Sequence, residues 1–105
     1  MRSIWTLILV LGCSTAPQEH AADSCTLIAG DYCNALASCT GTVDIEIHSR
    51  SLRDSCCEHV GCRADDTVSR DDVWECLDAI AAYGRTCDTQ DDMSACAWAS
   101  PWFGD

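Results

Sequence analysis

Residues 69–87 read SRDDVWECLDAIAAYGRTC and form the clearest structural pattern in the chain. Ser69 is an N-cap candidate, and the acidic residues after it favour the positive end of a helix. Gly84 is a natural C-terminal stop, which leaves Cys87 in the following turn. One apolar face follows from spacings of three and four residues: Val73, Cys76, Leu77, Ile80 and Tyr83. This stretch therefore predicts an amphipathic helix that buries a cysteine.

Three further segments have helical features. Residues 26–39, 51–60 and 89–100 each repeat apolar or cysteine side chains at helical spacing. The repeating residues are Cys25, Ile28, Tyr32, Leu36 and Cys39 in the first segment, Leu52, Cys56 and Val60 in the second, and Met93, Cys96 and Ala97 in the third, which Ser100-Pro101 ends. We predict an all-α fold, a small disulfide-stapled bundle of about four short helices.

The stretch between the first two segments has a different period. Val43, Ile45 and Ile47 alternate with polar residues, as in a strand, but no second strand signal accompanies them. We expect an extended crossover loop here, with a short edge strand as the alternative.

The N-terminus has the features of an export signal. Met1-Arg2-Ser3 is positively charged, and IWTLILVL over residues 4–11 is too short to span a bilayer, which needs about 20 residues. Residues 9–13, LVLGC, resemble the bacterial lipobox. The resemblance implies cleavage before Cys13, lipidation of its thiol and acylation of the new amine. Ser14 in this setting implies outer-membrane sorting. The alternative is an ordinary cut after Ala16 or Ala22 that discards Cys13.

The expected organisation follows from this boundary. Residues 1–12 are the cleaved signal peptide, residues 13–24 are the lipidated cysteine and a flexible tether, and residues 25–105 are a Cys-rich helical domain. A domain this small has a marginal hydrophobic core, since it buries only about 60% of its unfolded surface. Cross-links are therefore expected to stabilise it.

Ten cysteines are available for this. Lipidation of Cys13 leaves an odd number of disulfide candidates: Cys25, Cys33, Cys39, Cys56, Cys57, Cys62, Cys76, Cys87 and Cys96. Four disulfides and one free thiol is the simplest count, three disulfides and three thiols is the alternative, and the pairing stays open. Cys56 and Cys57 point about 100° apart on a helix. We expect them to bond to two different neighbours, or one of them to be the free thiol.

No cofactor or metal site is predicted. Zinc sites usually contain paired C-x₂₋₄-C spacings, and Cys57-x₄-Cys62 has no matching second pair. Acid pairs at residues 65–66, 71–72 and 91–92 do not fit a calcium loop. His59 beside Cys56 or Cys57 is the nucleophile–base candidate, but a disulfide next to a solvated histidine near a helix C-terminus is the favoured interpretation. We therefore do not expect an enzyme.

Charge narrows the range of partners. The net charge is −11, and all basic residues are arginine. Such a chain repels nucleic acid and anionic headgroups. The expected partners are the membrane, through the Cys13 anchor, and a protein of unknown identity.

A second resemblance covers residues 25–98. DYCNALASC at residues 31–39 and WECLDAI at residues 74–80, with Cys87 and Cys96, look like the small Cys-rich lipoproteins of myxobacterial-type genomes. That group carries no established activity, so the resemblance implies no functional residues. The expected function is an envelope lipoprotein that acts as a non-catalytic interaction or structural module. The alternatives are a secreted toxin or inhibitor, and a small exported hydrolase or redox protein.

Overall fold

The computed structural model describes residues 17–41, 44–88 and 93–101. Its elements are β1 (Gln18–His20), α2 (Ala21–Thr40), α3 (Ile45–Val60), β2 (Thr67–Ser69), α4 (Arg70–Thr86) and the short 3₁₀ helix η1 (Ser94–Cys96). The mainly helical prediction is confirmed. The described residues hold three α-helices rather than four, and they add a two-stranded sheet.

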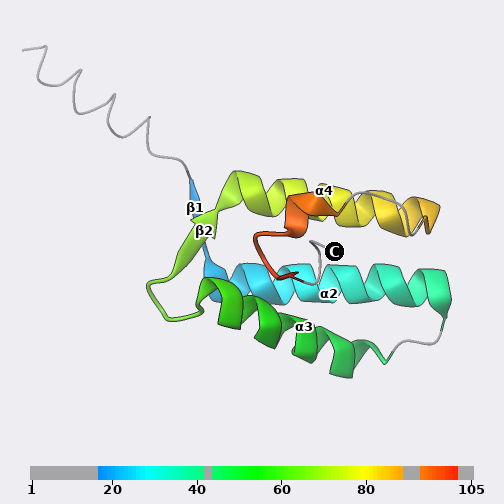
Figure 1. Cartoon of the computed structure of the whole chain (residues 1–105), viewed down its shortest axis with the longest axis horizontal. Helices are drawn as coiled ribbons and strands as arrows, with labels where there is room; N and C mark the ends of the chain where they lie inside the picture. Colours follow the sequence, from blue (N-terminus) through cyan, green and yellow to red (C-terminus); the bar gives the residue numbers. More distant parts are fainter. Residues whose placement is uncertain (1–16, 42–43, 89–92, 102–105) are drawn as a thin grey trace, which may run out of the picture.

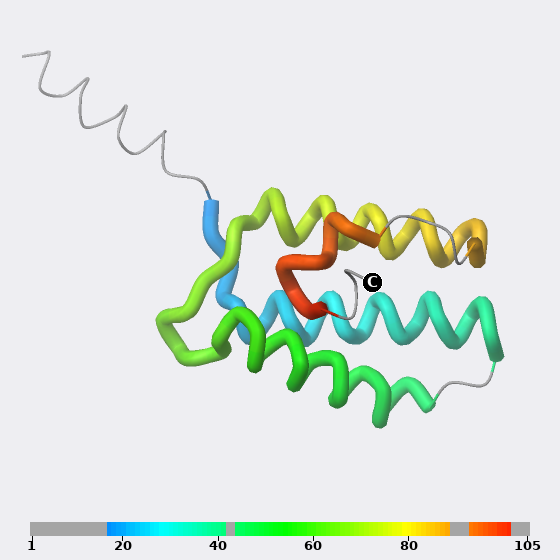
Figure 2. The backbone as a smooth tube through the Cα atoms, viewed as in Figure 1, coloured from blue at the N-terminus to red at the C-terminus, as the bar shows by residue number. Residues whose placement is uncertain are grey.

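Helix α2 lies in the middle of the domain, with α3 along one side and α4 along the other (Figure 1). The segment that contains η1 crosses over α2 (Figure 2). It reaches from α4, through the Cys76–Cys96 disulfide, to α3, where the Ser100 and Ser55 hydroxyls hydrogen bond at 2.9 Å. The buried cluster between these elements contains half the disulfide cysteines and three large aliphatic residues: Cys25, Ile28, Leu52, Cys56, Cys76, Ile80 and Cys96.

The folded part begins earlier than the expected boundary at residue 25. Residues 18–20, assigned above to a flexible tether, pair antiparallel with β2, and residues 21–24 form the first turn of α2. Ala21 is fully buried, and its N–H donates to the Asp66 carbonyl at 3.0 Å. Small residues and strands of three residues carry no periodic signal, which explains why the sequence pattern missed them. The predicted signal peptide, Cys13 and residues 14–16 of the tether lie outside the described residues.

The predicted crossover loop is wrong over residues 45–48, which are the start of α3. Asp44 caps this helix, because its carboxylate accepts a hydrogen bond from the Ile47 N–H at 3.2 Å. The alternating isoleucines that resembled a strand do not share a buried face: Ile45 is 40% exposed and Ile47 is 63% exposed. The cap and helical propensity decide the local structure here. Val43 lies outside the described residues.

Helix α4 follows its prediction closely, except at its end. Gly84 does not terminate the helix; it remains inside, where a Cβ atom would lie 3.3 Å from the Ala35 Cβ, so α2 and α4 approach closely there. The helix ends instead at Cys87, which adopts a left-handed conformation with φ of 53°. The predicted fourth helix is reduced to η1 in the described residues, and its expected start at residues 89–92 lies outside them.

Candidate functional site

Four disulfides join the described cysteines: Cys25–Cys56, Cys39–Cys87, Cys57–Cys62 and Cys76–Cys96. The first links α2 to α3, the second links the C-terminal ends of α2 and α4, and the fourth links α4 to η1. Each α-helix of the described part therefore carries at least one covalent cross-link. The sequence predicted disulfides; their pairing comes only from the structure.

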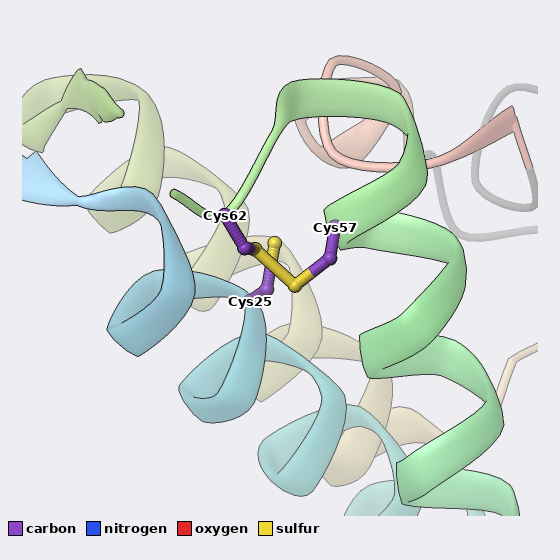
Figure 3. Close-up of side chains that lie close together, drawn as sticks. All are labelled: Cys25, Cys57 and Cys62. Atoms are coloured by element: carbon purple, nitrogen blue, oxygen red, sulfur yellow. A yellow bond between two sulfur atoms is a disulfide. The ribbon is translucent and has the colours of Figure 1, made fainter. Parts of the chain in front are cut away.

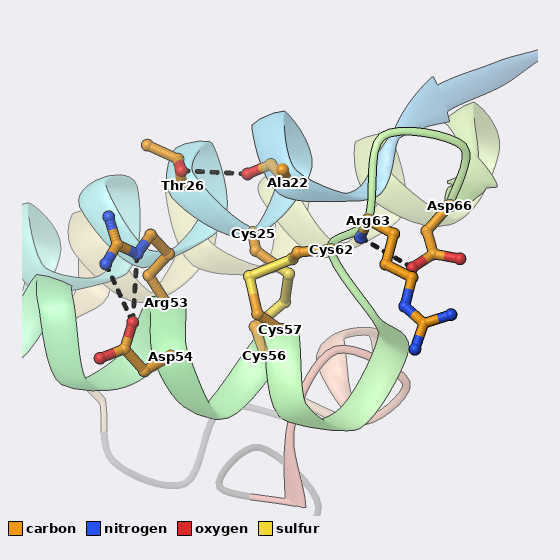
Figure 4. The surroundings of a disulfide bond; sticks show 10 residues. All are labelled: Ala22, Cys25, Thr26, Arg53, Asp54, Cys56, Cys57, Cys62, Arg63 and Asp66. Atoms are coloured by element: carbon orange, nitrogen blue, oxygen red, sulfur yellow. Dashed lines mark hydrogen bonds and ion pairs between the residues drawn. A yellow bond between two sulfur atoms is a disulfide. The ribbon is translucent and has the colours of Figure 1, made fainter.

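Two of these bonds form a sulfur cluster. The Sγ atoms of Cys25, Cys57 and Cys62 all lie within 4.8 Å of one another (Figure 3). Because Cys25 is bonded to Cys56, the disulfides of the adjacent residues Cys56 and Cys57 lie side by side between α2 and α3 (Figure 4). The expectation of two different partners is met, although Cys57 bonds to the loop after its own helix rather than to a neighbouring helix. Oxidised sulfurs are not thiolates, so the cluster in this form is not a metal site.

The free thiol of the described part is Cys33. Its side chain is 2% exposed on the inner face of α2, and burial raises the pKa of the thiol. A buried, protonated thiol is a poor nucleophile and packs as a small apolar residue. Cys33 therefore contributes to the core.

The nucleophile–base candidates do not come together. Cys56 and Cys57 are both in disulfides beside an exposed His59, and His20 and His48 are also exposed on other elements. A hollow of about 230 Å³ is lined by Ser55, Glu58, His59 and Pro101. In this hollow the Ser55 hydroxyl is hydrogen bonded to the Ser100 hydroxyl. A serine nucleophile would instead need a hydrogen bond to a base. Of the acid pairs, Asp71 and Asp72 lie in the first turn of α4, and Asp66 accepts a hydrogen bond from the Arg63 N–H at 2.8 Å.

A groove between the N-terminal halves of α2 and α4 is the most distinctive surface feature. It has a volume of about 210 Å³, and its apolar lining consists of Leu27, Val73, Trp74 and Leu77. Trp74 is 57% exposed and Leu27 is 47% exposed, although both are large apolar side chains. Sequence analysis missed this groove. The signal was present in Trp74, which interrupts the acidic outer face of its helix.

Helical geometry explains why these side chains point outward. Trp74 lies two residues before Cys76, and Leu27 lies two residues after Cys25, so each points about 200° away from a buried disulfide cysteine. The disulfides fix the inner faces of α2 and α4 toward α3 and η1. The same bonds therefore leave the opposite faces, with Trp74 and Leu27, open.

The rim of the groove is acidic. Asp23 and Glu19 line it together with Arg70. The Arg70 Nε atom lies 2.8 Å from the Glu19 Oε2 atom, so its charge is already paired. The groove thus combines an apolar floor with the exposed carboxylate of Asp23 on its rim.

No protein-family model, curated protein or solved structure matches this chain. Within the described ranges, no helix is long and apolar enough to cross a membrane. The disulfides, the groove and the N-terminal sequence are therefore the observations that bear on function.

Proposed function

We propose that this chain is an exported lipoprotein, anchored at Cys13 to the outer membrane, whose folded domain acts by binding a protein partner rather than by catalysis. The observation that carries the proposal is the set of four disulfides across the helices. Disulfides of this density persist in oxidising compartments outside the cytosol. The domain is accordingly suited to the cell envelope.

The lipobox supports the anchor. Each buried CH₂ of an acyl chain contributes about 0.8 kcal/mol, and stable anchoring needs two or more chains, which a lipobox product carries. Pro17, the first described residue, follows Cys13 by four positions, a span of at most about 14 Å. An anchor at Cys13 would therefore hold β1 and the adjoining groove close to the membrane surface.

The groove supports binding. An exposed tryptophan over an apolar floor is typical of protein interfaces, where tryptophan is enriched among the residues that dominate affinity.

The intact, non-reduced mass of the protein recovered from the membrane fraction tests the proposal. We expect a chain that begins at Cys13, with added acyl mass, and four disulfides at two hydrogens each, which is eight hydrogens fewer than the all-thiol form. The variant Cys13→Ala should leave the membrane fraction, whereas Cys33→Ala, which removes the buried thiol, should stay there. A soluble, unmodified chain that starts after Ala16 would contradict the anchor and favour a secreted toxin or inhibitor.

A further inference from the structure

We infer that the groove between α2 and α4 binds a cationic amphipathic segment of a partner protein, in which apolar side chains contact Trp74 and Leu27 and basic side chains face the surrounding aspartates. This inference rests on the proposed binding function and assigns it a surface and a partner chemistry.

The apolar part of the argument is the shape of the groove. Val73 is buried and Leu77 is half-buried, so they form its floor, while Trp74 and Leu27 rise from α4 and α2 as its exposed walls. The described C-terminal segment cannot cover it, because the Cys76–Cys96 disulfide holds that segment on the opposite side of α4. Two helices with an apolar channel between them are a common receptor for the apolar face of a third helix.

The charged part is a frame of four aspartates around the two walls. Asp23 and Asp31 lie four residues before and after Leu27, and Asp71 and Asp78 lie three before and four after Trp74. Spacings of three and four place each pair on the same helix face as its apolar residue. All four aspartates are exposed. We call Asp23, Asp31, Asp71 and Asp78 the acidic frame.

The negative charge of the acidic frame favours a cationic partner over an anionic one. A second copy of this chain carries the same net charge of −11 and would be repelled, as would an anionic phospholipid surface. Arg70 does not offset the frame, since it pairs with Glu19. The complementary occupant has leucine-like side chains on one face and lysine or arginine on both flanks.

The test uses the full chain in nanodiscs of zwitterionic phosphatidylcholine, or in buffer if the chain proves soluble, with empty discs as the blank. The probe is a fluorescein-labelled peptide of leucine and lysine, with the leucines at helical spacing and a length of about 14 residues, near the minimum for an isolated helix. Binding is followed by fluorescence anisotropy of the label, because Trp98 and Trp102 also emit and the chain's own emission would not report Trp74 alone.

Four variants, two in the groove and two controls outside it, locate the binding site. Trp74→Ala should weaken binding by about tenfold or more, as is typical of a central interface tryptophan. Ile47→Ala removes an equally exposed apolar side chain from α3 and should leave the affinity unchanged. The double variant Asp31→Asn, Asp78→Asn neutralises the frame in mid-helix and should weaken binding several-fold, whereas Glu58→Gln with Asp65→Asn, outside the frame, should not. Circular dichroism and the urea midpoint verify that each variant is folded.

Salt and the peptide's charge test the electrostatic part. Binding should weaken toward about 1 M salt, where the Debye length falls to about 3 Å. A peptide with glutamate in place of lysine should not bind. Equal binding of both peptides, unchanged affinity in Trp74→Ala, or a dimer that Trp74→Ala dissociates would overturn the inference.

The experiments distinguish the lipoprotein proposal from the groove assignment. An anchored, lipidated chain that does not bind the cationic peptide would overturn the groove assignment and leave the lipoprotein standing. A soluble chain that binds the peptide through Trp74 would remove the anchor and leave the groove assignment intact.

Discussion

The two ends of the α2–α4 pair are held together in different ways. At the C-terminal end, Cys39–Cys87 brings the two Cα atoms to 5.4 Å, and Tyr32 stacks on Tyr83 with ring centroids 6.0 Å apart. At the N-terminal end, a three-residue strand pair and the partly exposed Arg70–Glu19 ion pair join the elements. The disulfide holds the C-terminal ends of the two helices together. The non-covalent end carries the groove, where a partner has to be accommodated.

Of the changes that test this comparison, removal of the Cys39–Cys87 disulfide should lower the free energy of unfolding the most. The double variant Cys39→Ala, Cys87→Ala opens a loop with a sequence separation of 48 residues. The chain-entropy model gives a loss of about 4 kcal/mol in the free energy of unfolding, measured by urea denaturation. The matched double variant of Cys57–Cys62, with a separation of 5, should lose only about 2 kcal/mol. Equal losses would show that loop closure is not what stabilises the C-terminal end.

Two adjacent residues of α2 allow the core and the groove to be compared, because Ile28 lies in the core and Leu27 lies on the groove wall. Ile28→Ala removes a side chain that is 1% exposed, and it should lower the free energy of unfolding by about 2–5 kcal/mol because it leaves a cavity. Leu27→Ala, at the groove wall, should change it by less than about 0.5 kcal/mol. Thermal or urea unfolding measures both. A large loss for Leu27→Ala would mean that the groove is part of the core rather than a binding surface.

Alkaline pH should lower the stability of the fold through Cys33, which is buried in the C-terminal half of α2. Burial raises the pKa of this thiol, so the folded chain keeps a proton that the unfolded chain releases as the pH rises past 9.0. Unfolding then releases a proton, and stability falls with increasing pH by at most about 1.4 kcal/mol per pH unit from this group, until the folded pKa is passed. Urea midpoints from pH 7 to above pH 9.0 measure the slope.

The variant Cys33→Ala serves as the control for this titration. Just above pH 9.0, the urea midpoint of this variant should fall less steeply with pH than that of the unchanged chain. A loss of stability caused by Tyr32 should remain at higher pH. The pKa of its phenol is raised, mainly by burial and to a lesser extent by the neighbouring Tyr83 and Cys33. An unchanged slope in Cys33→Ala would assign the pH dependence to other groups.

The smallest effect is expected at the N-terminal end. Arg70→Ala breaks an ion pair between partly exposed side chains and should cost less than about 1 kcal/mol. A double-mutant cycle with Glu19→Gln isolates the coupling, which should decrease with added salt. A coupling as large as the Cys39–Cys87 contribution would remove the distinction between the two ends.

Much of the helical structure was readable from local patterns. The amphipathic repeat that begins at Val73 located α4 and its start after Ser69, although the helix continues past Gly84 to Thr86. The abundance of cysteines indicated disulfides, and four of them join described residues. The alternation at Ile45 and Ile47 led to a wrong prediction of extended structure. An alternating pattern indicates a strand when one face of the strand is buried, and here both isoleucines are exposed. The start of α2 escaped detection, since its buried residues are small.

The candidate groove was less predictable. Its walls lie 47 positions apart at Leu27 and Trp74, and no local pattern reports that two such positions meet. The acidic frame was visible as charge, but its relation to an apolar channel depends on the side-by-side packing of α2 and α4. Disulfide pairing is similar, because the Cys56–Cys57 neighbours have many sterically acceptable partners along the chain.

The sequence by itself determined the helical character, the acidity, the abundance of cross-linking cysteines and the lipobox-like N-terminus, because each depends on composition or on residues within a few positions of one another. The tertiary structure decided which cysteines pair, that Cys33 is buried and left over, that residues 18–24 join the fold, and that Trp74 and Leu27 face each other across one groove. These depend on contacts between residues far apart in the chain, and such contacts are set by how the helices pack.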